Sequence, residues 1–239
     1  GAQLNTLSVY YENEADNMRT FFKTNSINTI KNQYENYYSN YYQNISSTTN
    51  PTFKDNVEDN EFTVYQHFKI DSIWKPTLID DKISAAFHPT SLLEVLVMPN
   101  KKDRKTEFNL YYPSTRNHEI IIQLPTNWSV NNERKTINSK TFNYNFNVRY
   151  DPSKKQISIN HFLEIKKDHV PVSEFQNYYN SLKQVENYIS YSLITSKSSN
   201  SNTTSWLPLL GQVIFGLCVL FALWLAIKLY EYNPKTNIE

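Results

Sequence analysis

The stretch Phe142–Tyr150, with the sequence FNYNFNVRY, decides the fold class. Its aromatic and aliphatic side chains occupy every second position, and Asn143, Asn145, Asn147 and Arg149 occupy the positions between them. Successive side chains of a β-strand point to opposite faces of the sheet, so this pattern predicts a strand with one buried and one hydrated face. Sheets with one hydrated face are typically antiparallel, and we expect two of them to pack as a sandwich.

The same period of two recurs on both sides of this stretch. After a turn at Asp151–Ser153, alternate apolar residues from Ile157 to Ile165 predict the partner strand. Alternation predicts further strands at residues 7–11, 62–70, 92–97, 108–112 and 119–124. In the segment 62–70, Gln66 interrupts the apolar face.

Helical spacing appears near both ends of this β-rich region. It predicts helices at residues 14–23 and 27–44, the second with Ser26 as its N-cap, and residues 46–60 read as a turn-rich connector. Ser173 and Gln176 form a capping box that predicts a third helix extending to Leu193. The expected fold class is therefore α+β: an antiparallel β-sandwich flanked by N-terminal helices and one C-terminal packing helix, followed by a single transmembrane helix.

An apolar run at residues 207–227 predicts that transmembrane helix. It contains about 21 residues, enough to cross a hydrocarbon core of roughly 30 Å, and Gln212 is its only strongly polar side chain. Trp206 and Tyr230 lie where interfacial aromatic residues are expected. The residues expected to span the membrane are Leu207, Leu210, Ile214, Leu217, Leu220, Leu223 and Ile227. The alternative is a buried core helix.

These segments suggest five parts of the chain. They are an N-terminal strand and helical segment (1–48), a β-sandwich with its C-terminal helix (49–194), a flexible linker (195–205), a transmembrane helix (206–230) and a short tail (231–239). Lys228 and Lys235 follow the span and only Lys197 closely precedes it, so the positive-inside rule places the short tail in the cytoplasm and the bulk outside. A tail-anchored cytosolic protein is the alternative.

Composition excludes several function classes. The net charge is +1, which gives no general attraction to nucleic acid. Two of the three glycines, Gly211 and Gly216, lie in the apolar run, so phosphate-binding loops that need glycine are excluded. The one cysteine, Cys218, lies in the same run, which excludes a disulfide framework and a cysteine-based zinc site.

Titratable residues give weak site candidates. His67, His88, His118, His161 and His169 show no spacing suited to a shared metal, and His161 falls on an apolar strand face, where a core role is favoured. The pairs Glu58-Asp59 and Asp80-Asp81 are weak calcium candidates without the EF-hand pattern. We predict no catalytic, cofactor-binding or metal-binding residue, and no cofactor.

Two clusters remain open to a binding role. Lys101, Lys102, Arg104 and Lys105 form a basic loop that either contacts lipid headgroups or an acidic partner or is a solvated hairpin tip. The tyrosines 37, 38, 41 and 42 are either a carbohydrate or peptide platform or, more simply, core packing on one helix face.

Four phrases, taken in order, resemble one bacterial family. They are LSVYYENEADNMRTFF (7–22), NEFTVYQHFKIDSIW (60–74), LYYPSTRNHEIIIQLPTNW (110–128) and KKDHVPVSEF (166–175). The family is the transglutaminase-like proteins of Gram-negative bacteria, which have an N-terminal β-rich domain, a papain-like core and a terminal β-sandwich. The resemblance covers the terminal region only, from about Leu7 to Leu193. It implies that the Cys–His–Asp triad lies upstream of this chain, because Cys218 is in the apolar run.

The expected function is that of a non-catalytic extracytoplasmic accessory domain and membrane anchor, which positions a transglutaminase-like core at the inner membrane. The expected partners are the lipid bilayer, the upstream core of the same protein and a periplasmic protein or peptide, with no nucleic acid. One alternative is an independent membrane-anchored binding module, such as a receptor or adhesin ectodomain. A second is a small hydrolase.

Overall fold

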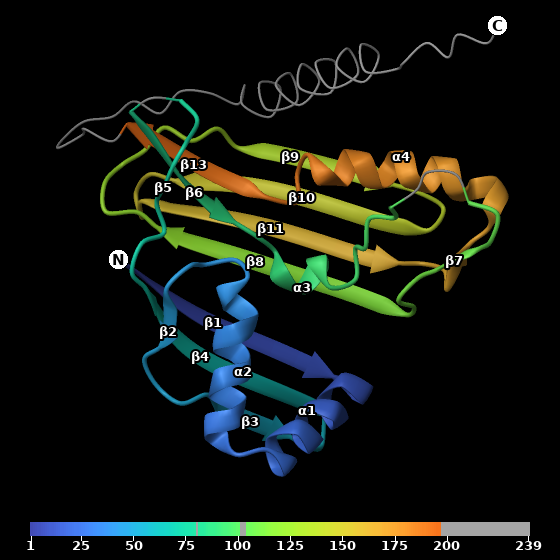
Figure 1. Cartoon of the computed structure of the whole chain (residues 1–239), viewed down its shortest axis with the longest axis horizontal. Helices are drawn as coiled ribbons and strands as arrows, with labels where there is room; N and C mark the ends of the chain where they lie inside the picture. The colour runs from blue at the N-terminus through green and yellow to red at the C-terminus, as the bar shows by residue number, and fades with distance from the viewer. Residues whose placement is uncertain (80, 101–103, 197–239) are drawn as a thin grey trace, which may run out of the picture. The chain divides into compact units, whose positions relative to one another are not determined.

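The computed structural model describes residues 1–79, 81–100 and 104–196 (Figure 1). The chain forms two compact units: the first contains Gly1–His88 and the described residues from Tyr191 on, and the second contains Pro89–Ser190. This division places residues 49–88 with the N-terminal helices, whereas the sequence pattern grouped them with 49–194. Every strand pair in the described residues is antiparallel, and helices accompany the sheets, so the α+β class is confirmed.

A four-stranded sheet forms the centre of the first unit. Strand β4 (Glu61–Ile70) pairs along its whole length with β1 (Ala2–Tyr11), and its other edge pairs with β2 (Ile45–Ser47) and β3 (Thr52–Asn56). The expected connector at 46–60 is therefore wrong in part. Its polar composition concealed two short edge strands, which carry few buried side chains and so leave little apolar pattern.

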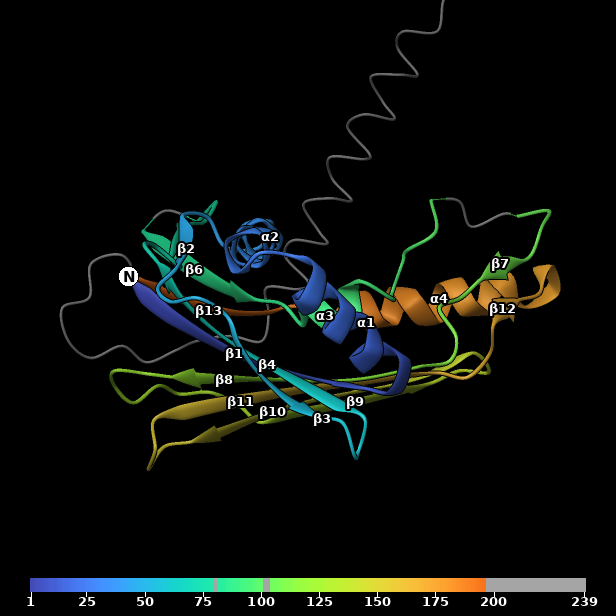
Figure 2. The ribbon, with the colours of Figure 1, turned by 90° about the horizontal axis from the view of Figure 1, so that it is seen from below.

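Two helices cover one face of this sheet (Figure 2). Helix α1 (Glu12–Thr24) packs Met18 and Phe22 around Ala15, Phe62 and Val64. Helix α2 (Ile27–Ser39) begins at Ser26, whose hydroxyl accepts a hydrogen bond from the Thr29 N–H, as expected for an N-cap. Gln66 is buried on the same sheet face, where its carboxamide oxygen accepts a hydrogen bond from the Thr6 hydroxyl.

A second, three-stranded sheet of the first unit joins distant parts of the chain. Strand β6 (Lys82–Phe87) lies between β5 (Lys75–Pro76) and β13 (Tyr191–Ser196). The prediction that the last helix extends to Leu193 is wrong, because Leu193 lies in β13 and pairs with Ala85. The partner strand β6 lies more than one hundred residues earlier in the chain, so the local sequence around Leu193 does not indicate this pairing.

The second unit is built on a four-stranded sheet in the order β8-β11-β10-β9 (Figure 1). The strands are β8 (Ser114–Gln123), β9 (Glu133–Asn138), β10 (Phe142–Asp151) and β11 (Gln156–Ile165). Strands β10 and β11 contain the alternating stretches that the sequence singled out, and they pair over their full length. Their buried side chains all lie on one face: Phe142, Tyr144, Phe146, Val148, Ile157, Ile159, His161, Leu163 and Ile165.

Within this unit a helix packs on the buried face. Helix α4 (Phe175–Glu186) follows a 3-10 turn, η1 (Val172–Glu174), and buries an apolar stripe that contacts the sheet through Tyr178 and Phe142. The expected sandwich of two sheets is thus replaced here by a helix on a sheet, because alternation shows that a face is buried but not what covers it. The expected capping box is also wrong: Glu174 is the N-cap, and no side chain caps the helix.

The remaining elements of the second unit are short. Residues 92–97, predicted as a strand, instead belong to helix α3 (Thr90–Leu93) and the turn after it, in which the amides of Val95 and Leu96 bond to the Leu92 carbonyl. A short apolar run does not distinguish a strand from a helical turn. Strand β7 (Phe108–Asn109) pairs with β12 (His169–Val170), so the strand predicted at 108–112 is shorter than expected.

The predicted membrane span lies outside the described residues, as do its interface residues Trp206 and Tyr230. Among the helices that the structure does describe, none is both long and apolar enough to cross a bilayer.

Candidate functional site

The face of the β8-β11-β10-β9 sheet opposite helix α4 carries polar side chains; we call it the open face. The strand register aligns side chains from neighbouring strands into rows across it. Asn147 of β10 lies opposite Arg134 of β9 on one side and opposite Asn160 of β11 on the other. Asn145 lies opposite Phe162 in the next row. Directly opposed residues share a face, so strands distant in sequence contribute to one surface.

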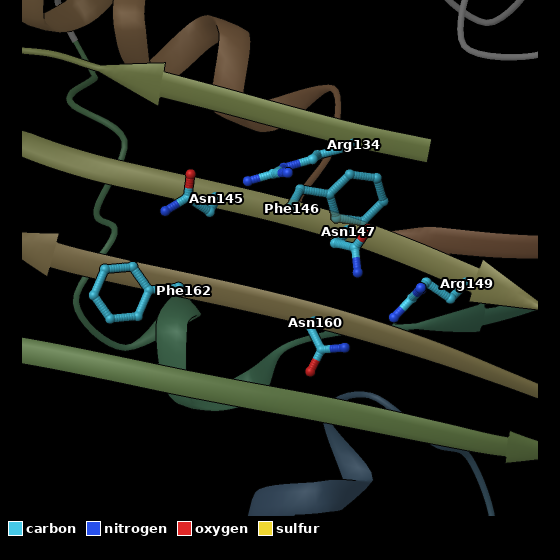
Figure 3. A pocket seen from close by; sticks show the side chains of 7 residues that line it. All are labelled: Arg134, Asn145, Phe146, Asn147, Arg149, Asn160 and Phe162. Atoms are coloured by element: carbon cyan, nitrogen blue, oxygen red, sulfur yellow. The ribbon is translucent and has the colours of Figure 1, made fainter. Parts of the chain in front are cut away.

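An open hollow lies over these rows (Figure 3). Its volume is about 500 Å³, and it is lined by Arg134, Asn145, Phe146, Asn147, Arg149, Asn160 and Phe162. Phe146 belongs to the buried face and only borders the hollow, whereas the ring of Phe162 is half-buried on the open face itself. The hollow therefore combines two guanidinium groups, three carboxamides and one aromatic ring.

Part of this set is already engaged within the protein. The Thr136 hydroxyl donates a hydrogen bond of 2.8 Å to the carboxamide oxygen of Asn145. At the end of β10, Asn143 donates to Glu164 and accepts from Lys166. Within the part of the chain that the structure describes, no side-chain hydrogen bond or ion pair engages the remaining polar groups of the hollow: Arg134, Arg149, Asn147 and Asn160.

These groups are suited to binding rather than to reaction. A carboxamide offers both donors and an acceptor, and a guanidinium offers several donors in a plane that matches a carboxylate. None of the hollow's side chains is an ordinary general acid, general base or nucleophile at neutral pH. Because they project from paired strands, their positions are fixed by the sheet rather than by a loop.

The buried face contains a polar network centred on His161. This side chain is 0% exposed, as expected for a core histidine, and its Nδ1 lies 2.9 Å from the Tyr144 hydroxyl, which donates to the Tyr188 carbonyl. Since the hydroxyl proton goes to that carbonyl, Nδ1–H of His161 donates to the hydroxyl oxygen. Its Nε2 is buried without a partner, and burial lowers the pKa of His161 to about 3. The ring is therefore neutral at physiological pH.

A serine and a histidine meet near this network. Ser91 Oγ lies 2.9 Å from His118 Nδ1, and His118 faces His161 across the β8–β11 pair. Burial lowers the pKa of His118 to about 4, which makes it a weak base. Among the described residues, no carboxylate forms a hydrogen bond or ion pair with His118, so the orienting member of a hydrolase triad is not seen at this pair.

The other sequence candidates lie elsewhere. Tyr38 and Tyr42 are buried against Phe68 and Ile70, with Tyr37 and Tyr41 packed beside them, so the tyrosine cluster is core packing. Asp59 accepts a hydrogen bond from Asn56 in the β3–β4 turn. Arg104 lies over the rings of Phe108 and Phe175. Asp80, Lys101 and Lys102 are outside the described residues. Across the described ranges, no cluster of three or more His, Cys, Asp or Glu side chains could hold a metal ion.

The open face was only partly visible in the sequence. The hydrated positions of Phe142–Tyr150 were identified as such, but Arg134, Asn160 and Phe162 were not connected to them. Strand β9 has a single buried apolar residue, Ile137, and was not predicted at all. The residue that could have indicated this site is Phe162, because it is an aromatic residue at a hydrated position of an alternating strand.

Comparison with curated proteins and with solved structures finds no match to this chain. A family model, described as a Domain of Unknown Function with solved-structure structure (DUF3858), matches residues 83–195, a little under half of the chain. The match starts in β6 and ends in β13, and it includes the whole sheet that carries the open face. Residues 83–195 therefore contain a DUF3858 domain, and this finding does not link the chain to transglutaminase-like proteins.

Proposed function

We propose that this chain is a non-catalytic accessory module and membrane anchor, which positions an upstream transglutaminase-like core at a bacterial inner membrane, on its periplasmic side. The open face is the surface with which the module binds its partner or presents a substrate. The observation that carries this proposal is that four polar groups lining the hollow of this face have no side-chain hydrogen bond or ion pair within the described chain, while none of the side chains that line the hollow is an ordinary acid, base or nucleophile.

Two features of the sequence support the remaining parts of the proposal. The ordered phrases between Leu7 and Phe175 resemble the terminal region of transglutaminase-like proteins, whose catalytic core precedes that region. The apolar run at 207–227 is long enough to hold the module at a bilayer. Tethering raises the effective concentration of the module near other membrane-bound molecules, which strengthens binding without any new contact.

The upstream coding sequence of the gene tests the link to a catalytic core. A reading frame that continues upstream of Gly1 and encodes a papain-like core with its Cys, His and Asp supports the proposal. A native start near Gly1 would instead favour an independent membrane-anchored binding module, which the same open face would serve equally well.

Cysteine labelling tests the orientation. Ser199→Cys in a Cys218→Ser background places one thiol on the N-terminal side of the expected span. An impermeant maleimide should label this thiol once the outer membrane alone is opened. The matched control is Thr236→Cys in the same background, which should react only after the inner membrane is permeabilised. The reverse pattern would refute a periplasmic module, and release of the chain by carbonate would refute the anchor.

A further inference from the structure

We infer that the open face binds an acidic polysaccharide, a chain of sugar rings that carry carboxylate groups. The inference rests on the proposed function only in taking the open face as the binding surface, and it adds the chemical class of the ligand. It comes from the side chains of the hollow, their spacing across the strands and the distribution of charge.

The carboxamides match the hydroxyl groups of a sugar. Asn147 and Asn160 stand directly opposite each other on neighbouring strands and have no partner among the described residues. Each offers donors and an acceptor, and a sugar hydroxyl is likewise both donor and acceptor. Neighbouring strands lie about 4.8 Å apart, so a row of such groups can bond to successive polar groups of one extended chain.

The ring of Phe162 adds an apolar plane beside these amides. It lies opposite Asn145 and is half-buried among polar neighbours. A sugar ring has an apolar C–H face and a polar rim of hydroxyls, so it can stack on the aromatic ring while its hydroxyls reach the carboxamides. A protein partner would need a larger group of desolvated aromatic or aliphatic anchors. Among the described residues that line the hollow, Phe162 is the only apolar one on the open face. The exposed Ile121 of the same face lies on β8, opposite Ser158, and does not line the hollow.

The two arginines select for negative charge. Arg134 of β9 and Arg149 of β10 have no acidic partner among the described residues, and both belong to the same side of the sheet. Glu119 lies at the other end of the row, on β8 opposite Asn160. Two further carboxylates of this face are engaged within the protein: Glu164 accepts a hydrogen bond from Asn143, and Asp151 accepts one from Ser153. The hollow itself is therefore positive at β9 and β10, so ligand carboxylates are expected to lie over these two strands.

Binding of a defined oligosaccharide tests the inference. The full-length chain in detergent micelles is titrated by calorimetry with oligogalacturonate, and separately with the same oligosaccharide after full methyl esterification, which removes its charge. We expect the acid form to bind more tightly, and its affinity to fall as salt rises. Arg134→Gln combined with Arg149→Gln should weaken binding of the acid form at least about tenfold, since charge-assisted hydrogen bonds are lost, and should barely affect the ester. Phe162→Ala should weaken both.

The matched control is Lys23→Gln combined with Lys54→Gln, which changes net charge equally at exposed positions of the first unit. It should bind like the unmodified chain. Failure of the unmodified chain to bind oligogalacturonate would overturn the inference, and so would equal losses in the control and arginine variants. Equal affinity for polyglutamate or single-stranded oligothymidylate would also overturn it, because the face would then recognise charge rather than sugar. None of these outcomes bears on the upstream core or the orientation, which the earlier experiments decide separately.

Discussion

His161 should make the second unit unstable in mild acid. Its ring is 0% exposed, and the pKa is lowered from 6.5 to about 3, chiefly by burial and secondarily by His118. In the unfolded chain the ring takes up a proton as the pH falls below about 6.5, whereas the folded ring does not until about pH 3. The unfolding free energy therefore has its full value above about pH 6.5, and the contribution that depends on a neutral His161 is lost as the pH falls from there toward 3.

The expected loss follows from this difference in pKa. At about 1.4 kcal/mol per pH unit, lowering the pH from about 7.5 to 4.5 should remove roughly 3 kcal/mol of unfolding free energy through His161 alone. His118, with its pKa lowered to about 4, adds a smaller loss because it is partly exposed. This pH range avoids most carboxylate titration, so the histidines dominate the slope.

The variant His161→Phe isolates this effect. Phenylalanine keeps a planar ring beside Phe146, whose centroid lies 5.2 Å from that of His161, and it leaves the Tyr144 hydroxyl its bond to the Tyr188 carbonyl. A destabilisation that is independent of pH shifts the whole curve of unfolding free energy against pH. Loss of the His161 titration instead makes the decrease between about pH 7.5 and 4.5 smaller by roughly 3 kcal/mol.

Hydrogen exchange of the β10 and β11 amides, corrected for the intrinsic rate at each pH, measures this local stability in the full-length chain. The control is His67→Gln, at an exposed position in the first unit, which should leave the slope unchanged. Equal stability of the unmodified chain across this range, or a full slope in His161→Phe, would show that His161 does not cause the loss.

Three further predictions concern stability. Leu163→Ala should lower the unfolding free energy of the second unit by about 2–5 kcal/mol, because the side chain is 0% exposed; a urea midpoint within error of the unmodified chain would contradict it. Ser26→Ala should cost about 1 kcal/mol through loss of the N-cap bond to Thr29, seen as faster amide exchange confined to α2. Arg19→Gln should lower the stability of the first unit, seen as faster amide exchange in α1 and β3, because Arg19 bonds to Asp16, Asp55 and Asn60; unchanged exchange there would show that these bonds contribute nothing.

The sequence predicted the elements whose pattern is local. Strands β10 and β11 alternate without interruption, and their buried faces are those expected. Ser26 caps α2 because the cap depends on a few neighbouring residues. The strand predicted at residues 92–97 was wrong because a short apolar run fits a helical turn as well as a strand. Strands β6 and β13 were not predicted for another reason: they pair with each other although they lie far apart in the chain, and neither alternates regularly enough to be recognised alone.

The candidate site was harder to predict than the fold because it depends on register. The alternation in Phe142–Tyr150 shows which residues are hydrated, but not that Arg134 and Asn160 lie on either side of Asn147. A one-residue slip in either pairing would turn the partner strand's side chains to the other face and dissolve the row. Register is held by the buried face, where large side chains such as Tyr144 and Leu163 lie opposite each other.

Phe162 is the residue of the open face whose position folding explains least. A phenylalanine contributes most to folding when it is fully buried, as Phe142 and Phe146 are on the other side of the same sheet. Phe162 occupies a hydrated position in a strand whose buried face is complete without it, so its ring gains less there than a core residue does. Beside it lie carboxamides and guanidinium groups that the described chain leaves without partners. Folding alone does not account for that combination, whereas a ligand with both an apolar face and polar, charged edges does.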